Sequence, residues 1–376
     1  MTSRIDLLFD ARHIQQSGVG TYIQTELPHL ERVFAERQLA LGLLVNPDKV
    51  PTVRDSTTVI SSQPPEAPMY GANEQRAWAH ALRTVRPRAM WVPHYPFPFA
   101  TLAPANRHTE LFVTIHDTLH LRPKSVTGQN VAFRAYARAM IDMDGRRCKT
   151  IFTPSQTTAN SLAKVIPQAR FVLTQIPVGD RWLTPANLDL CPIKGRYILF
   201  VGNAKWHKNL MLLFEAFDDV AQDIPHNLVI AGAGAAVRNF DERVERYANK
   251  HADRVETIGR VDFETLRAIV AGADILVMPS LHEGVGLPPL EAMASHTAVL
   301  SSSIPALKET CGDGAEYFDP HDHRGLADLL RRYCGDDQAR AELAARGWAH
   351  VTERQSRISR TAAAEAICAA LNTARR

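Results

Sequence analysis

Short apolar runs alternate with longer segments of helical period along the whole chain, and this alternation predicts parallel sheets wrapped by helices. The scheme occurs twice in series, so we expect an α/β fold of two doubly wound, Rossmann-like units. The first unit is expected over 1–182 and the second over 196–356. Between them, 183–195 contains Pro and Gly and lacks a clear period, which is typical of a linker. The expected strands are 5–9, 90–93, 112–115, 150–154 and 171–176 in the first half, and 197–201, 228–231, 255–258, 275–279 and 299–302 in the second.

The length of 376 residues also favours two domains, because single cores stop growing near about 250–300 residues. Open parallel sheets bind ligands beyond the carboxyl ends of their strands. We therefore expect two units that face each other across a ligand-binding cleft.

The composition excludes several classes of protein. Hydrophobic residues make up 45% and charged residues 22%, which are globular values that leave no long disordered tract. The chain start lacks the pattern of a signal peptide, and no apolar run approaches the roughly 20 residues of a membrane span. A cytoplasmic location is therefore expected. The five scattered cysteines indicate neither a disulfide framework nor a zinc site.

Charge is distributed unevenly along the chain. Residues 1–190 contain 21 Lys and Arg against 15 Asp and Glu, whereas the remainder has 22 against 25. A basic first half favours an anionic acceptor or an anionic membrane surface as a partner, and no nucleic acid is expected. One basic pattern, interleaved with apolar residues, fits a lipid surface or, alternatively, a solvated helix face; it consists of Arg134, Arg138, Arg146, Arg147 and Lys149.

The most informative segment is 282–291, which follows an expected strand and opens a helical pattern. Gly284 and Gly286 allow a ligand to approach the backbone closely, and the helix start directs free N–H groups at it. The Glu291 carboxylate can accept hydrogen bonds from two vicinal ribose hydroxyls. Glu283 precedes the glycines and is expected nearer to a sugar.

This segment resembles the E-x7-E motif of family 4 glycosyltransferases, which are retaining enzymes of the GT-B fold. The resemblance implies a nucleotide diphosphate sugar as a substrate, with no cofactor and no metal ion. It adds Val285 and Leu287 to the donor-binding residues, beside Glu283, Gly284, Gly286 and Glu291. It also implies that the C-terminal helix, about 357–376, packs back on the first unit.

A second matching segment is 200–210, in which a strand ends at Gly202 and a Lys-Asn pair opens the next helix. Lys208 at that position can neutralise a diphosphate leaving group. Many members of the resembling family have an arginine nearby, where this chain has Asn203 and His207. Lys205 is a candidate for the second cation.

The run 228–237 resembles the glycine fingerprint of dinucleotide-binding folds, although Val237 occupies its last small position. This run motivates one alternative, an NAD(P)-dependent oxidoreductase. Further along, Arg260 follows a strand in a stretch that in the resembling family lies beside the nucleobase. Arg260 could stack on the base or be an ordinary surface residue.

The first half supplies three further candidate segments. Gly18 and Gly20 lie in a loop before a helix and resemble the glycine segment that touches the donor phosphate. His116 and Asp117 end an expected strand at a place where, in the resembling family, a histidine lies near the transferred sugar. His94 and Tyr95 follow another strand, and we assign them to the acceptor pocket.

Together these features predict a retaining, metal-independent hexosyltransferase with His116, Asp117, Lys208 and Glu283 as catalytic residues. The motifs resemble bacterial mannosyl- and rhamnosyltransferases of O-antigen and exopolysaccharide assembly, which favours a GDP-sugar donor over a UDP-sugar. The expected acceptor is a glycan or a polyprenyl-linked sugar, and the expected location is cytoplasmic, at or near the inner face of the plasma membrane. A non-catalytic sugar-nucleotide-binding protein is the second alternative.

Overall fold

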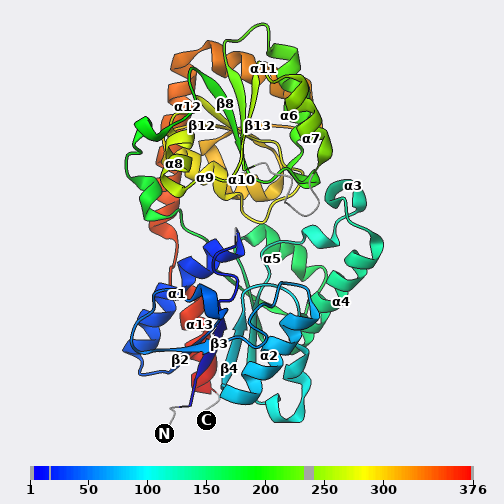
Figure 1. Cartoon of the computed structure of the whole chain (residues 1–376), viewed down its shortest axis with the longest axis vertical. Coiled ribbons are helices and arrows are strands. Elements are labelled where there is room, and N and C mark those ends of the chain that lie inside the picture. The colour runs from blue at the N-terminus through cyan, green and yellow to red at the C-terminus, as the bar shows by residue number, and fades with distance from the viewer. Residues whose placement is uncertain (1–3, 17, 233–240, 374–376) are drawn as a thin grey trace. The chain divides into compact units, whose positions relative to one another are not determined.

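The chain forms two compact units, each built around its own parallel sheet (Figure 1). The computed structural model describes residues 4–16, 18–232 and 241–373. The first unit comprises 1–121, 132–177 and 359–376, and the second comprises 122–131 and 178–358. Two doubly wound, Rossmann-like units confirm the expected α/β fold class.

The first unit contains a seven-stranded sheet of order β3-β2-β1-β4-β5-β6-β7, with every pair parallel. Its central strands are fully buried, as expected for a sheet covered by helices on both faces. The strands are β1 (Leu7–Asp10), β2 (Leu41–Val45), β3 (Thr57–Ser61), β4 (Ala89–Val92), β5 (Glu110–Thr114), β6 (Thr150–Thr153) and β7 (Arg170–Leu173). The helices are α1 (Val19–Glu36), α2 (Ala72–Val85), α4 (Val131–Arg147), α5 (Gln156–Ala163) and α13 (Ala362–Thr373).

The second unit contains a six-stranded parallel sheet of order β10-β9-β8-β11-β12-β13. Its strands are β8 (Tyr197–Val201), β9 (Asn227–Ala231), β10 (Val255–Ile258), β11 (Ile275–Met278), β12 (Ala298–Ser302) and β13 (Glu316–Phe318). Its helices are α3 (Lys124–Thr127), α6 (Leu210–Val220), α7 (Glu242–Lys250), α8 (Phe263–Ala271), α9 (Leu287–Ala294), α10 (Pro305–Cys311), α11 (His323–Gly335) and α12 (Asp337–Arg357).

Each strand expected from the sequence is present, and the structure adds β2, β3 and β13. β2 is an uninterrupted apolar run, so its sequence carried a strand signal that we did not use. β3 and β13 are edge strands with mixed polarity, and such strands give no clear pattern.

Both sheets reverse their winding direction at one pair of neighbouring strands. In the first unit this switch point lies between β1 and β4, and in the second it lies between β8 and β11. Ligands of doubly wound sheets bind beyond the carboxyl ends of the strands at this point. The loops that follow these four strands are therefore where a binding site is expected.

Apart from the short segment 122–131, the chain passes from the first unit to the second at Pro177/Val178 and returns at Ile358/Ser359. The segment 183–195, which we expected to be a linker, lies inside the second unit and contains one 3-10 turn, Leu188–Leu190. The Gln355 side chain binds both backbone groups of Val178, donating to the carbonyl oxygen at 2.6 Å and accepting from the N–H at 3.1 Å. The two connecting segments are thus fastened to each other.

Candidate functional site

The loops after β8 and β11 bring Lys208 and Glu283 together at the switch point of the second unit. The Lys208 Nζ lies 2.7 Å from the Glu283 Oε1, and the Ser280 hydroxyl donates to the same oxygen at 2.6 Å. Only 14% of the lysine side chain and 10% of the glutamate side chain are exposed. A charge-assisted, largely buried pair therefore occupies the place where a ligand of this fold binds.

The Glu283 carboxylate is held in its charged form. Burial alone would raise its pKa, but the charge of Lys208, the neighbouring His207 and the two hydrogen bonds together hold the pKa below its usual value. Near neutral pH, Glu283 is therefore an acceptor-only group, and Lys208 is a cation whose position it fixes.

Two contacts that the sequence did not predict join the loops after β8 and β11. The Asn209 amide donates to the carbonyl oxygens of Pro279 and Pro320, at 3.1 and 2.8 Å, and the Leu281 N–H donates to the His207 carbonyl at 2.8 Å. Asn209 has a φ of 56°, a left-handed conformation that Asn tolerates better than most residues. In the sequence, the Lys208-Asn209 pair was the feature that could have indicated these contacts.

The α9 start is shaped by Gly286, whose φ is 88° and where an added Cβ would lie 2.4 Å from the Leu307 Cδ2. Only glycine satisfies both conditions. Glu291 lies one turn further along α9 and is half-buried, and burial raises its pKa to about 7. No donor in the described part of the chain hydrogen-bonds to its carboxylate, so this group keeps its capacity for a ligand.

The other predicted donor residues of the second unit differ in their surroundings. Gly202 ends β8 and is half-buried, as is Asn203, whose Oδ1 has no hydrogen-bond partner among the residues that the structure describes. Lys205 is half-buried just before the 3-10 turn Trp206–Lys208. Arg260 is exposed in the loop between β10 and α8. The fingerprint continues from Gly232 into 233–240, which lie outside the described residues.

In the first unit, His116 follows β5 and has a defined tautomer. Its Nε2 lies 2.8 Å from the Pro93 carbonyl oxygen, which can only accept, so Nε2 carries the proton. Burial lowers the pKa of His116, which favours the neutral ring with an Nδ1 lone pair. The adjacent Asp117 accepts the Leu119 N–H at 2.7 Å and caps the following turn.

The glycine loop of the first unit joins β1 to α1. Gly18 has a φ of 75° and precedes the helix, and a Cβ on Gly20 would lie 2.6 Å from the Ile14 carbonyl oxygen. The next turn of the helix presents Tyr22, whose ring lies edge-on to that of His116 with centroids 4.9 Å apart. Ser17 lies outside the described residues.

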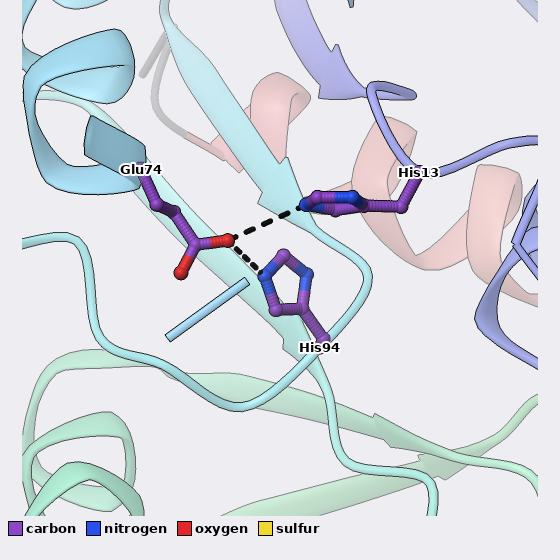
Figure 2. Close-up of side chains that lie close together, drawn as sticks. All are labelled: His13, Glu74 and His94. Atoms are coloured by element: carbon purple, nitrogen blue, oxygen red, sulfur yellow. Dashed lines mark hydrogen bonds and ion pairs between the residues drawn. The ribbon is translucent and has the colours of Figure 1, made fainter. Parts of the chain in front are cut away.

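The acceptor candidates His94 and Tyr95 follow β4 at the switch point of the first unit. Figure 2 shows His94 and His13 directed at one oxygen of Glu74, with the His94 Nε2 at 2.6 Å and the His13 Nε2 at 3.5 Å. The Tyr95 hydroxyl is buried and has no hydrogen-bond partner within the described ranges. Sequence reasoning missed His13 and Glu74, since a glutamate on an amphipathic helix predicts a solvent-facing residue.

Asp10 and Arg12 form a second pair in the same loop region. The guanidinium donates two bonds to the Asp10 carboxylate, at 2.8 and 2.6 Å, and the Trp78 Nε1 donates a third at 2.7 Å. Burial opposes the charge on Asp10, but Arg12 outweighs it and holds the Asp10 pKa well below its usual range. Both charges are fully buried and neutralise each other.

The chain has one Asp-x-Asp tripeptide, Asp142 to Asp144, the pattern with which metal-dependent transferases hold their ion. It lies inside α4 and not after a strand. Asp142 is paired with Arg146 at 2.8 Å, whereas Asp144 is buried and its pKa is raised well above the usual value by burial. These two carboxyl groups do not form a set of metal ligands.

Comparison with known proteins assigns the second unit. Its fold is that of a doubly wound, Rossmann-like unit, with a Lys-Glu pair at the switch point and a helix that begins at a glycine. Residues 191–349 match the family model "Glycosyl transferases group 1". This match to a glycosyltransferase group 1 domain confirms the resemblance found in the motifs of that segment.

Two curated relatives are bacterial mannosyltransferases. The chain is 30% identical over 219 residues to the O-antigen chain mannosyltransferase RfbU of Salmonella typhimurium, which covers 58% of this chain and 59% of the relative. It is 25% identical over 219 residues to the O-antigen chain mannosyltransferase B of Escherichia coli, at 54% and 56% coverage. The matches thus span somewhat more than half the length of these relatives.

Solved structures match the fold over nearly the whole chain. Sucrose-phosphate synthase from Thermosynechococcus elongatus gives a TM-score of 0.73 at 17% identity, covering 98% of both chains. Anabaena HepE in complex with UDP and glucose gives 0.70 at 15% identity, covering 98% of this chain and all of the other. In the described part of the chain, no helix has the length and apolar character to cross a membrane.

Proposed function

We propose that this chain is a retaining hexosyltransferase that moves mannose or a deoxyhexose from a GDP-sugar to a glycan or lipid-linked acceptor in surface polysaccharide synthesis. The observation that carries the proposal is the Lys208–Glu283 pair at the β8/β11 switch point, inside the matched glycosyltransferase domain. The mannosyltransferases among the relatives support the choice of sugar. HepE, crystallised with UDP-glucose, keeps UDP-sugars as the competing donor class.

On the donor side, the bond between the sugar C1 and the diphosphate oxygen breaks, and negative charge grows on the leaving group. Lys208 lies at the start of α6 and can stabilise that charge, with N–H groups near Gly284 and Gly286 assisting. Glu283 fixes the lysine and can accept hydroxyls of the sugar. Glu291 is assigned to the ribose, and Arg260 to the base.

On the acceptor side, an acceptor hydroxyl forms the new bond to C1 on the face that the diphosphate leaves, and its proton passes to the departing phosphate oxygen. No nucleophilic side chain is required by this route, and the configuration at C1 is retained. We assign His116 to this step, because its neutral ring keeps an Nδ1 lone pair that can accept a hydrogen bond from a hydroxyl group. His94 and Tyr95 are assigned to the acceptor pocket.

Turnover in the presence of EDTA tests the activity and its independence of metal together. We expect release of GDP from a GDP-hexose with excess EDTA at nearly the rate without it, because Lys208 and backbone amides replace the ion. Thermal shift with GDP, UDP, ADP, dTDP and NAD identifies the nucleotide, and the largest shift is expected for GDP. Activity that appears only after Mg²⁺ or Mn²⁺ is added would contradict the phosphate site, and a shift for NAD alone would favour an oxidoreductase.

We also propose that the basic face of α4 binds an anionic membrane. The structure pairs Arg146 with Asp142 and Lys149 with Glu110, and directs Arg147 at two carbonyls. Arg138 makes one long contact, 3.4 Å to the Val165 carbonyl oxygen, so we assign Arg134 and Arg138 to the lipid. Anionic vesicles should therefore bind more chain than neutral vesicles, and salt should weaken the difference. Replacing Arg134 and Arg138 by Gln should remove it, whereas replacing the exposed Lys194 and Lys250 by Gln should not. Equal binding to both kinds of vesicle would contradict the proposal that α4 binds an anionic membrane.

A further inference from the structure

We propose that His13, Glu74 and His94 form a site for one transition-metal dication of the Zn²⁺ type in the first unit. The three side chains come from separate parts of the chain: the loop after β1, the helix α2 and the loop after β4 (Figure 2). One ligand atom from each lies within 4.8 Å of the other two. Two imidazoles and one carboxylate are a ligand set that zinc uses in proteins.

One of the three ligand atoms, the His13 Nε2, lies too far from the Glu74 carboxylate for a good hydrogen bond. The His94 Nε2 already binds the Glu74 Oε1 at 2.6 Å, and the His13 Nε2 lies 3.5 Å from that same oxygen, beyond a good hydrogen bond. This nitrogen is buried, in a side chain that is 2% exposed, and it makes no hydrogen bond in the described structure. Zinc at about 2.0–2.1 Å from each donor needs donors roughly 3.3 Å apart, so the His94 Nε2 must move away from Glu74 when an ion binds.

Charge also favours a cation at this point. Arg12 lies 3.8 Å from Glu74, but its guanidinium is already neutralised by Asp10. With both histidines neutral, Asp10, Arg12 and Glu74 together therefore carry one net negative charge. Nitrogen and carboxylate donors together select zinc-like ions over Mg²⁺ or Ca²⁺, which prefer oxygen.

The surroundings of the ligands orient them. The Tyr70 N–H donates to the second Glu74 oxygen at 2.9 Å. The Gln16 amide lies 3.1 Å from the His13 Nδ1, and its oxygen must face this nitrogen to accept an N–H and leave the Nε2 lone pair for the ion. Such outer contacts fix the ring that a metal binds. An ion here would tie α2 to the two loops of the switch point, which is a structural role separate from the diphosphate chemistry of Lys208.

The test uses the whole chain without a histidine tag, stripped with a strong chelator and then titrated with Zn²⁺ or Co²⁺. We expect one equivalent to bind per chain, with a raised Tm, and Co²⁺ should give the visible absorption of a low-coordinate site. His13→Ala and Glu74→Gln should each weaken binding by about 100-fold or more. His108→Ala, an exposed histidine of the same unit, should change nothing.

If the wild-type chain binds Zn²⁺ no more tightly than His13→Ala does, the proposal is wrong. The cluster would then hold a proton shared by Glu74 and a histidine instead of a metal ion. If His13→Ala fails to fold, judged by its circular dichroism, His94→Ala and the wild-type stoichiometry decide the question. Zn²⁺, and not Mg²⁺, should restore the stability that the chelator removes. This outcome is independent of any dependence of turnover on Mg²⁺.

Discussion

Replacing Lys208 by Ala should lower turnover on the order of 10²-fold or beyond, with a smaller loss of nucleotide binding. Negative charge on the diphosphate grows as the glycosidic bond breaks, so the lysine acts more strongly in the transition state than in the ground state. The measurement is kcat and KM for the donor, together with the Kd for GDP. Lys208→Ala with unchanged turnover would show that the switch point of the second unit is not the donor site.

The ion pair complicates this experiment and also suggests its control. Removing Lys208 takes away the charge that offsets the burial of Glu283, which destabilises the fold and can by itself lower activity. The double variant with Glu283→Gln removes both charges, so its Tm separates folding from chemistry. Lys250→Ala, an exposed lysine of the same unit, is the matched control and should keep wild-type turnover.

Replacing Glu291 by Ala should weaken donor binding by about 1.5–3 kcal/mol, which is the range for hydrogen bonds to a charged group. The expected loss is similar in the ground and transition states, so KM should rise while kcat changes little. Isothermal titration calorimetry with the GDP-sugar measures this loss of affinity. Wild-type affinity in this variant would remove Glu291 from the nucleoside site.

The raised pKa of Glu291 adds a test by pH. Burial lifts this pKa from 4.5 to about 7, and only the ionised carboxylate accepts both ribose hydroxyls with its two oxygens. Donor affinity of the wild type should therefore increase as the pH rises through 7, and Glu291→Ala should lose that increase. The GDP-sugar is the better probe, because its substituted diphosphate keeps the same charge over this range, unlike the terminal phosphate of GDP.

The sequence largely predicted where the residues that we assign to the donor lie in the fold, because they follow apolar strands directly. Lys208 and Glu283 are far apart in the chain, yet each ends a strand-loop segment, and in a doubly wound sheet such ends meet at the switch point. What the sequence did not predict is their direct pairing, or the role of Asn209 in joining the two loops. These depend on side-chain directions within irregular loops, for which no periodic pattern exists.

The buried polar cluster of the first unit was harder to predict from the sequence. Glu74 lies on an amphipathic helix, where a carboxylate normally faces water, and only the tertiary structure places it beside Arg12 and His94. His13 was one of 15 histidines and carried no motif. The linker expected at 183–195 was also uncertain for a physical reason, because Pro and Gly indicate irregular backbone but do not show to which unit that backbone belongs.

The first unit is discontinuous, and this determines when it can be completed during synthesis. Helix α13 packs against α1 and β7, and its Leu371 carbonyl accepts a 2.6 Å hydrogen bond from Arg88. On the ribosome, the seven strands of that sheet emerge well before this helix, and the whole second unit is translated in between. The apolar surface that α13 covers therefore stays open until this helix is made, so the sheet that is begun first is covered only after the second unit has been synthesised.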